Sequence, residues 1–170
     1  MNRRNLLLGA TATAAAGTGL YLAGPGPDYS QASASLRAEM AARSDADMRY
    51  LVHHAVLAAN SHNTQPWLFS TGERHLEIAP DLRRETPIVD PDHHHLFASL
   101  GCAAENLSLA ALAAGAQANI AFVSAAVGLS VDLERTRAVP DPLFAAIRSR
   151  QCTRVDYNGR ASEAAHLASL

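Results

Sequence analysis

The sequence of 170 residues contains no lysine, and all fourteen of its basic side chains are arginines. Without a lysine amine the chain cannot form a Schiff base, which excludes ordinary pyridoxal-phosphate chemistry. Arginine instead suits the recognition of phosphate, because its planar guanidinium donates two parallel hydrogen bonds. The formal net charge of −2 gives no sign of bulk nucleic-acid binding. The length corresponds to about one domain.

Cysteine is also scarce, with only Cys102 and Cys152 in the chain. The two residues form no metal-binding pattern; they either pair in an oxidising compartment or stay unpaired, and both readings are open. The triplet His93–His95 invites a metal interpretation, but consecutive residues fan around a helix and no clean ligand pair is present. No Ser-His-Asp, Cys-His or paired-carboxylate arrangement stands out, so we assign no catalytic side chain and no metal ligand.

The N-terminus has the features of an export signal. Arg3 and Arg4 stand directly before an apolar run that reaches Leu22 and is diluted with Ala, Gly and Thr, which is typical of twin-arginine signals. Residues 24–27 then break any helix, and residues 32–34 offer an Ala-x-Ala cleavage site. We expect export by the twin-arginine translocase to the periplasm, cell envelope or exterior. An uncleaved run would act as a membrane anchor; the alternative is a structural N-terminal helix.

From residue 35 onward, helical and strand patterns alternate, and residues 35–43 have a helix-forming composition. Apolar residues at three- and four-residue spacing predict a helix over residues 48–59, on which we interpret His53 and His54 as surface or boundary residues. Asp90-Pro91 joins a capping carboxylate to a proline suited to the first helical position, so it predicts the start of a long apolar helix that stops at Gly115. The remaining predicted elements are strands at 67–69, 75–78, 118–123 and 129–133, and a helix at 143–149.

A dense polar cluster joins the first helix to the first strand: Asn60-Ser61-His62-Asn63-Thr64-Gln65-Pro66-Trp67. We call residues 60–67 the corner. Asn, Ser and Thr favour turns because their side chains bond nearby backbone, and Pro66 pushes Gln65 toward an extended conformation. Such a corner can present several neutral hydrogen-bonding groups to a polar ring. The alternative is a well-bonded turn in which Trp67 anchors the core.

The corner resembles the same junction of the nitroreductase-like FMN family, whose pattern is Pro-Ser-Ser-x-Asn-x-Gln-Pro-Trp, and in particular its Acg-like branch. Ala59 and Asn60 stand where the family has Pro and its first Ser. The resemblance implies that Asn60 and Ser61 contact flavin, and that Asn63 and Gln65 shape the same pocket. It also implies an α+β fold, with an antiparallel sheet and flanking helices around a long central helix.

Two further stretches carry the resemblance. Residues 100–107 are similar to the central helix of the family, which packs the dimer core and so implies an apolar interface. Residues 147–154, which we call the basic segment, resemble the phosphate motif of the family, with Cys152 where the family has Ser. The resemblance implies that Arg150 and Arg154 hold the FMN phosphate and that Arg148 assists. The alternative is a solvated basic helix end favoured by the helix dipole.

The order of the motifs suggests a domain organisation. In ordinary nitroreductases the phosphate motif precedes the corner, whereas here it follows by about 85 residues. Acg-like proteins resemble two fused units, so we expect a signal and linker over residues 1–34, a first unit over 35–142, and the start of a truncated second unit over 143–170. The missing surface would come from a second half or from a homodimer.

The function implied by the resemblance is hydride transfer from NAD(P)H through FMN to a nitroaromatic or quinone-like acceptor. Two alternatives belong to other classes. One is a non-catalytic exported protein that binds or sequesters flavin, and the other is a helical interaction domain anchored at the membrane. The sequence does not separate NADH from NADPH and does not identify the acceptor.

Overall fold

The computed structural model describes residues 29–38, 40–42, 44–139, 141–152, 156 and 158–168. The chain forms two compact units, residues 1–38 and 39–170. The described part of the first unit contains one helix, α2 (Tyr29–Leu36), which includes the predicted cleavage site at residues 32–34. The twin arginines Arg3 and Arg4 lie outside the described residues.

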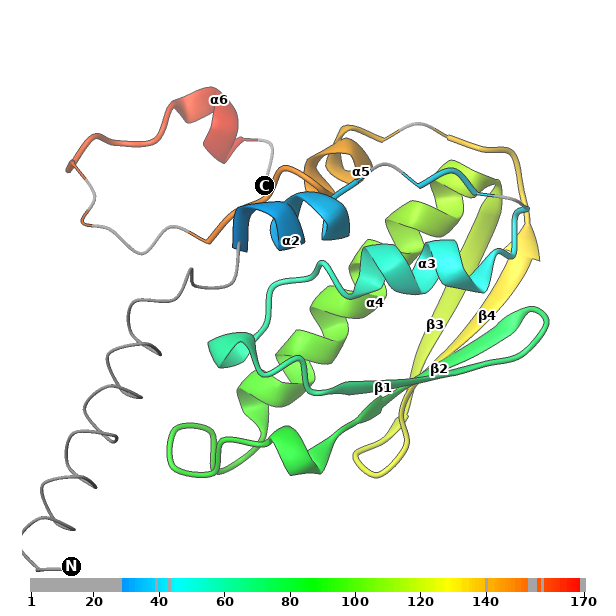
Figure 1. The fold of residues 1–170 in the computed structure, drawn as a ribbon, viewed down its shortest axis with the longest axis horizontal. Coiled ribbons are helices and arrows are strands. Elements are labelled where there is room, and N and C mark those ends of the chain that lie inside the picture. Colours follow the sequence, from blue (N-terminus) through cyan, green and yellow to red (C-terminus); the bar gives the residue numbers. More distant parts are fainter. Residues whose placement is uncertain are drawn as a thin grey trace, which may run out of the picture. The chain divides into compact units, whose positions relative to one another are not determined.

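The second unit combines helices with one antiparallel sheet (Figure 1). Its helices are α3 (Met48–Ala55), α4 (His94–Ala114), α5 (Pro142–Ile147) and α6 (Ala164–Leu167), with short 3-10 turns η1 (Ser61–Asn63) and η2 (Leu82–Arg84). The strands are β1 (Trp67–Thr71), β2 (His75–Pro80), β3 (Ala116–Ser124) and β4 (Gly128–Arg135), in the order β1-β2-β4-β3. The predicted α+β class, the four strands and the long helix are therefore confirmed.

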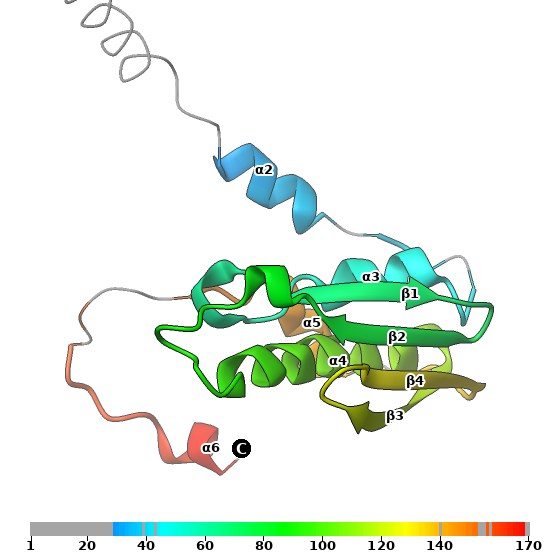
Figure 2. The ribbon, with the colours of Figure 1, turned by 90° about the horizontal axis from the view of Figure 1, so that it is seen from below.

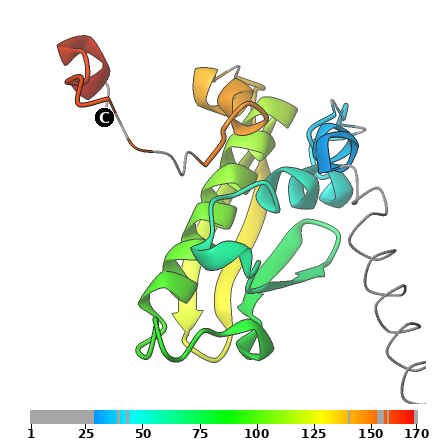
Figure 3. The ribbon, with the colours of Figure 1, turned by 60° about the vertical axis from the view of Figure 1, so that its left-hand side comes forward.

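Helix α4 is the centre of this unit. It packs along one face of the sheet against β2, β3 and β4, as the view in Figure 2 shows. Helix α3 lies beside α4, and α5 contacts the same helix (Figure 3). By length and hydropathy α4 resembles a membrane span, but Leu100, Leu107 and six further residues of it are buried in the core.

At the centre of the sheet, in β2 and β4, inward apolar side chains alternate with outward polar side chains. Leu76 and Ile78 of β2 and Val131 of β4 are completely buried on the face toward α4. Burying each such side chain contributes roughly 1.5–3 kcal/mol. On the opposite face His75 bonds the Asp132 carboxylate across the strand pair at 2.8 Å. The pattern of period two thus fixes which face of the sheet the helix covers.

The start of α4 differs from the prediction. The sequence predicts the helix at Asp90-Pro91, but it begins at His94, after a turn in which His93 has a positive φ of 59°. Asp90 still caps the helix, because its two carboxylate oxygens accept the backbone amides of His95 and Leu96, both at 2.9 Å. The predicted capping role of the Asp90 carboxylate is therefore confirmed, whereas the predicted first residue of the helix is wrong. The end is confirmed, since Gly115 adopts the left-handed conformation at φ 88°.

The interpretation of His54 as a surface or boundary residue is wrong. His54 is only 2% exposed, and its Nδ1 lies 2.8 Å from the Tyr50 carbonyl oxygen of the preceding turn. The rings of Tyr50 and Phe144 lie on it, with centroids 4.5 and 5.1 Å away. Phe144 belongs to α5, which is far away in sequence. The helical pattern of α3 alone therefore does not reveal that Phe144 shields His54 from solvent.

Gly128 offers a test of the hairpin that sets the register of the sheet. It has a φ of 87°, and a Cβ placed on it would overlap the Ile78 carbonyl. We expect Gly128→Ala to lower the free energy of unfolding by roughly 2–3 kcal/mol, through strain and overlap. The matched control is Gly101→Ala on α4, where a Cβ meets nothing within 4 Å; it should add about 0.5–1 kcal/mol. Urea unfolding measures both, and equal effects would contradict this account.

Candidate functional site

The corner has an unusual backbone. His62, Asn63 and Gln65 all have positive φ angles, of 50°, 58° and 50°. The extended conformation predicted for Gln65 is therefore wrong. A positive φ is energetically unfavourable for every residue except glycine, and of the three residue types Asn tolerates it best. Strained residues of this kind persist only where surrounding contacts hold them, and they cluster at functional sites. The geometry therefore makes the corner a candidate site.

Hydrogen bonds inside the corner hold this conformation. Asn60 contributes twice: its side-chain Nδ2 donates to the Ala58 carbonyl at 3.2 Å, and its Oδ1 accepts the Gln65 amide at 2.9 Å. The Thr64 hydroxyl donates to the Ser61 carbonyl at 3.0 Å. Asn60 thus has a bracing role here, and the flavin contact implied for it stays a prediction.

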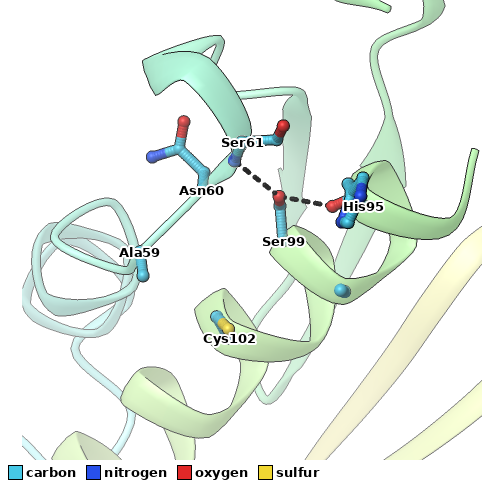
Figure 4. Close-up of a pocket in the computed structure, with 7 residues that line it drawn as sticks. Ala59, Asn60, Ser61, His95, Ser99 and Cys102 are labelled. Atoms are coloured by element: carbon cyan, nitrogen blue, oxygen red, sulfur yellow. Dashed lines mark hydrogen bonds between the residues drawn. The ribbon is translucent and has the colours of Figure 1, made fainter. Parts of the chain in front are cut away.

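A small cavity lies between the corner and the first turns of α4 (Figure 4). Its volume is about 240 Å³, and it is lined by Ala59, Asn60, Ser61, His95, Ala98, Ser99 and Cys102. The last four of these residues recur at three- and four-residue spacing and so share one face of α4. Ligand pockets commonly have volumes of about 300–1,000 Å³. This cavity therefore encloses only part of a ligand as large as a nucleotide.

Ser99 ties the corner to α4. Its hydroxyl accepts the Ser61 backbone amide at 3.2 Å and donates to the His95 carbonyl at 2.6 Å, as Figure 4 shows. The side chain is only 3% exposed. A hydroxyl can donate one bond and accept others, so a single buried group satisfies both partners. The position of Ser61 at the cavity thus depends on Ser99.

Asp90 fixes the start of the same helix. Burial opposes ionisation of its carboxyl group, but the bonds from the His95 and Leu96 amides, aided by the imidazoles of His95 and His93, outweigh that cost. The pKa of Asp90 therefore lies below its ordinary value. The cap holds His95 and Ser99 where they line the cavity.

The basic segment meets the chain just ahead of the corner. Arg150 Nη2 donates to the Leu57 carbonyl at 3.0 Å, and Leu57 precedes Asn60 by three residues. Its Nη1 lies 3.4 Å from the Cys152 sulfur, while its buried Nε has no hydrogen-bond partner among the described residues. Arg150 therefore retains donor capacity close to the corner, because a guanidinium has five N–H groups.

The other predicted residues of the basic segment lie in different surroundings. Arg148, at the end of α5, lines a second cavity with Tyr50 and His54. Cys152 is exposed and forms no disulfide with Cys102. Arg154 lies outside the described residues, so its predicted phosphate contact stays a prediction.

The structure thus brings together part of the predicted site. Asn60 and Ser61 line the cavity, whereas Asn63 and Gln65 are exposed on the same turn. Sequence reasoning missed His95, Ser99 and Cys102, although their helical spacing was readable. It also missed Arg84, which donates to the Thr64 carbonyl at 3.3 Å and pairs with the buried Asp81 carboxylate.

Asn106 also has a defined partner. Its side-chain amide donates to the His54 carbonyl at 3.0 Å, near the end of α3. The same carbonyl also accepts the Leu57 backbone amide at 3.2 Å, so the Asn106 amide is an additional donor to it. The bond from Asn106 agrees with a structural role for this residue and fixes the angle between α3 and α4.

Neither the comparison with models of known protein families nor the search of curated proteins found a match for this chain.

We expect Ser99→Ala to loosen the corner. The substitution leaves the part-buried Ser61 amide without its partner, and losing such a bond costs about 0.5–1.5 kcal/mol. Ser108→Ala is the matched control on the same helix, since Ser108 is half-buried and its hydroxyl forms no hydrogen bond with the described residues. Hydrogen exchange of the Ser61 amide should accelerate in the first variant and stay unchanged in the second. Unchanged protection in Ser99→Ala would show that the bond does not hold the corner.

The stability that the Asp90 cap contributes should depend on pH. Because the folded pKa of Asp90 lies below the unfolded value of about 3.9, its stabilisation is complete above that value and is lost as pH falls through the folded pKa. Asp90→Asn should therefore lower Tm at neutral pH, and its difference from wild type should shrink in acid. Glu105→Gln, at an exposed position on α4, should show no such trend. A difference that stays constant with pH would contradict the assignment.

Proposed function

We propose that this chain is the first part of an exported FMN-dependent oxidoreductase of the nitroreductase-like family, Acg-like branch. In this proposal FMN lies between the corner and the basic segment. When bound, FMN would supply hydride transfer from NAD(P)H to a nitroaromatic or quinone-like acceptor. The supporting observation is that Arg150, with its buried Nε unpaired among the described residues, touches the chain three residues before the strained corner.

The donors of the corner suit a polar ring. The Ser61 hydroxyl and the side-chain amides of Asn63 and Gln65 form no hydrogen bond with other described residues. They are neutral groups that both donate and accept. Flavin presents alternating ring nitrogens and carbonyl oxygens, so such groups match its edge. The chain's residues would orient the ring and exclude water beside it.

The donors of the basic segment suit a phosphate. Arg150 would bind one phosphate oxygen through its unused N–H groups, and Arg154 would supply a second guanidinium, as the resemblance implies. Leu57 and Asn60 are at most about 11 Å apart, because consecutive Cα atoms are separated by 3.8 Å. A single mononucleotide can reach both ends over that distance.

The cavity at the corner is too small to enclose the whole cofactor. We therefore propose that a further surface completes the site, from a second unit or from another copy of this chain. Export is part of the same proposal. A twin-arginine pathway carries folded proteins with their cofactors, which agrees with a flavoprotein.

The decisive experiment is reconstitution of the purified chain with FMN, followed by gel filtration and absorbance. We expect retained flavin, and we expect Arg150→Gln to weaken FMN binding about tenfold or more, because a charge-assisted bond is lost. Arg137→Gln removes the same charge from an exposed position in the loop after β4 and is the matched control. Equal retention by wild type and Arg150→Gln would remove the phosphate assignment.

The same preparation separates the alternatives. Bleaching of bound flavin by NADPH supports the oxidoreductase. Bound flavin that neither NADH nor NADPH reduces, even after the missing surface is supplied, points to a flavin-binding or flavin-sequestering protein. A colourless protein under all these conditions supports the membrane-anchored interaction domain instead.

A further inference from the structure

The second cavity lies at the other end of α4. It has a volume of about 230 Å³ and is lined by Tyr50 and His54 of α3, Ala113 of α4, Phe144 and Arg148 at α5, and the loop residues 40–42. Cys102, at the first cavity, precedes Ala113 by eleven residues, which corresponds to about 16 Å along the helix axis. The two cavities are therefore separate places on the molecule.

Two polar groups of this cavity have hydrogen-bonding capacity that no described residue uses. Tyr50 is 5% and His54 is 2% exposed. The Tyr50 hydroxyl forms no hydrogen bond with any described residue, and His54 forms only the one from Nδ1, which leaves Nε2 open. The Tyr50 hydroxyl and His54 Nε2 both keep some accessible surface beside the cavity, so a ligand bound there can pair with them.

The charge in the cavity is positive. Burial raises the pKa of the Tyr50 hydroxyl, and the guanidinium of Arg148 opposes that rise. Burial lowers the pKa of His54, and the same guanidinium adds to the decrease. Arg148 is thus close enough to act on both groups, and its five N–H groups allow a ligand contact in addition to its existing interactions.

The walls of the cavity are largely aromatic. The rings of Tyr50 and Phe144 lie 6.4 Å apart between centroids and are tilted by 41°, and the His54 ring contacts both, with centroids 4.5 and 5.1 Å away. A dry cavity of about 150 Å³ already accommodates benzene. A volume of about 230 Å³ therefore accommodates one six-membered ring with a small polar substituent.

We infer that this cavity binds a small aromatic carboxylate. The carboxylate pairs with Arg148, a polar atom of the ligand pairs with the Tyr50 hydroxyl or His54 Nε2, and the ring packs against Phe144. This inference goes beyond the proposed flavin function and does not rest on it. It assigns Arg148 to the aromatic acid rather than to the nucleotide phosphate, which leaves Arg150 and Arg154 for the latter.

Isothermal titration of the full chain with sodium benzoate tests the inference. We expect saturable binding, with acetate and benzyl alcohol at least about tenfold weaker, because one lacks the ring and the other the charge. Arg148→Gln should weaken benzoate binding about tenfold or more, and Tyr50→Phe, which keeps the ring, about fivefold. Arg137→Gln, the matched charge control, should bind benzoate as wild type does.

Three results would overturn the inference: no saturable benzoate binding, equal binding of acetate, or binding that is unchanged by both Arg148→Gln and Tyr50→Phe. The FMN assay of the preceding section separates the two proposals. Arg148→Gln should retain FMN as wild type does. A loss of FMN in this variant would return Arg148 to the phosphate and overturn its assignment here, whereas failure of wild type to bind FMN would leave the benzoate result standing.

Discussion

The burial of α4 is the constraint on which the rest of this structure depends. Eight of its residues are buried against the sheet and α3, and the two cavities lie along the same helix. One is beside Ser99 near its start and the other beside Ala113 near its end. Because a packed helix is stiff, the same apolar contacts fix the positions of the α4 residues that line both cavities. The Asp90 cap and the Gly115 turn determine where that rigid support begins and ends.

The strained corner is possible because α4 is fixed in this way. Three positive φ angles in a few residues would not survive in an isolated turn. Here the Asn60 side chain bonds two backbone groups of the corner, and Ser99 holds it to the helix. The side chains of Ser61, Asn63 and Gln65 are thereby left for other partners. The Asn60 amide holds the backbone, so the neutral side chains of the other corner residues are available to bind a ligand.

Periodicity in the sequence predicted most of the fold. The alternation of β2 is clear in its sequence, and the end of α4 follows from a single glycine, because local geometry decides both. The errors arise where distant segments meet. His54 is buried because Phe144 covers it, and the start of α4 is displaced because residues 91–93 form a turn of their own. The α4 side of the first cavity was missed since nothing in the sequence says which helix the corner meets.

The basic segment shows why a motif is not yet a site. Arg148 and Arg150 both follow the last residue of α5, Ile147, and their side chains lie in different surroundings. Arg148 lies with Tyr50 and His54, while Arg150 reaches back to Leu57. A linear pattern of arginines suggests one phosphate clamp, whereas the backbone divides the guanidinium groups between two environments. The two guanidinium groups thus lie in two separate surroundings, which is the physical reason for proposing separate roles for them.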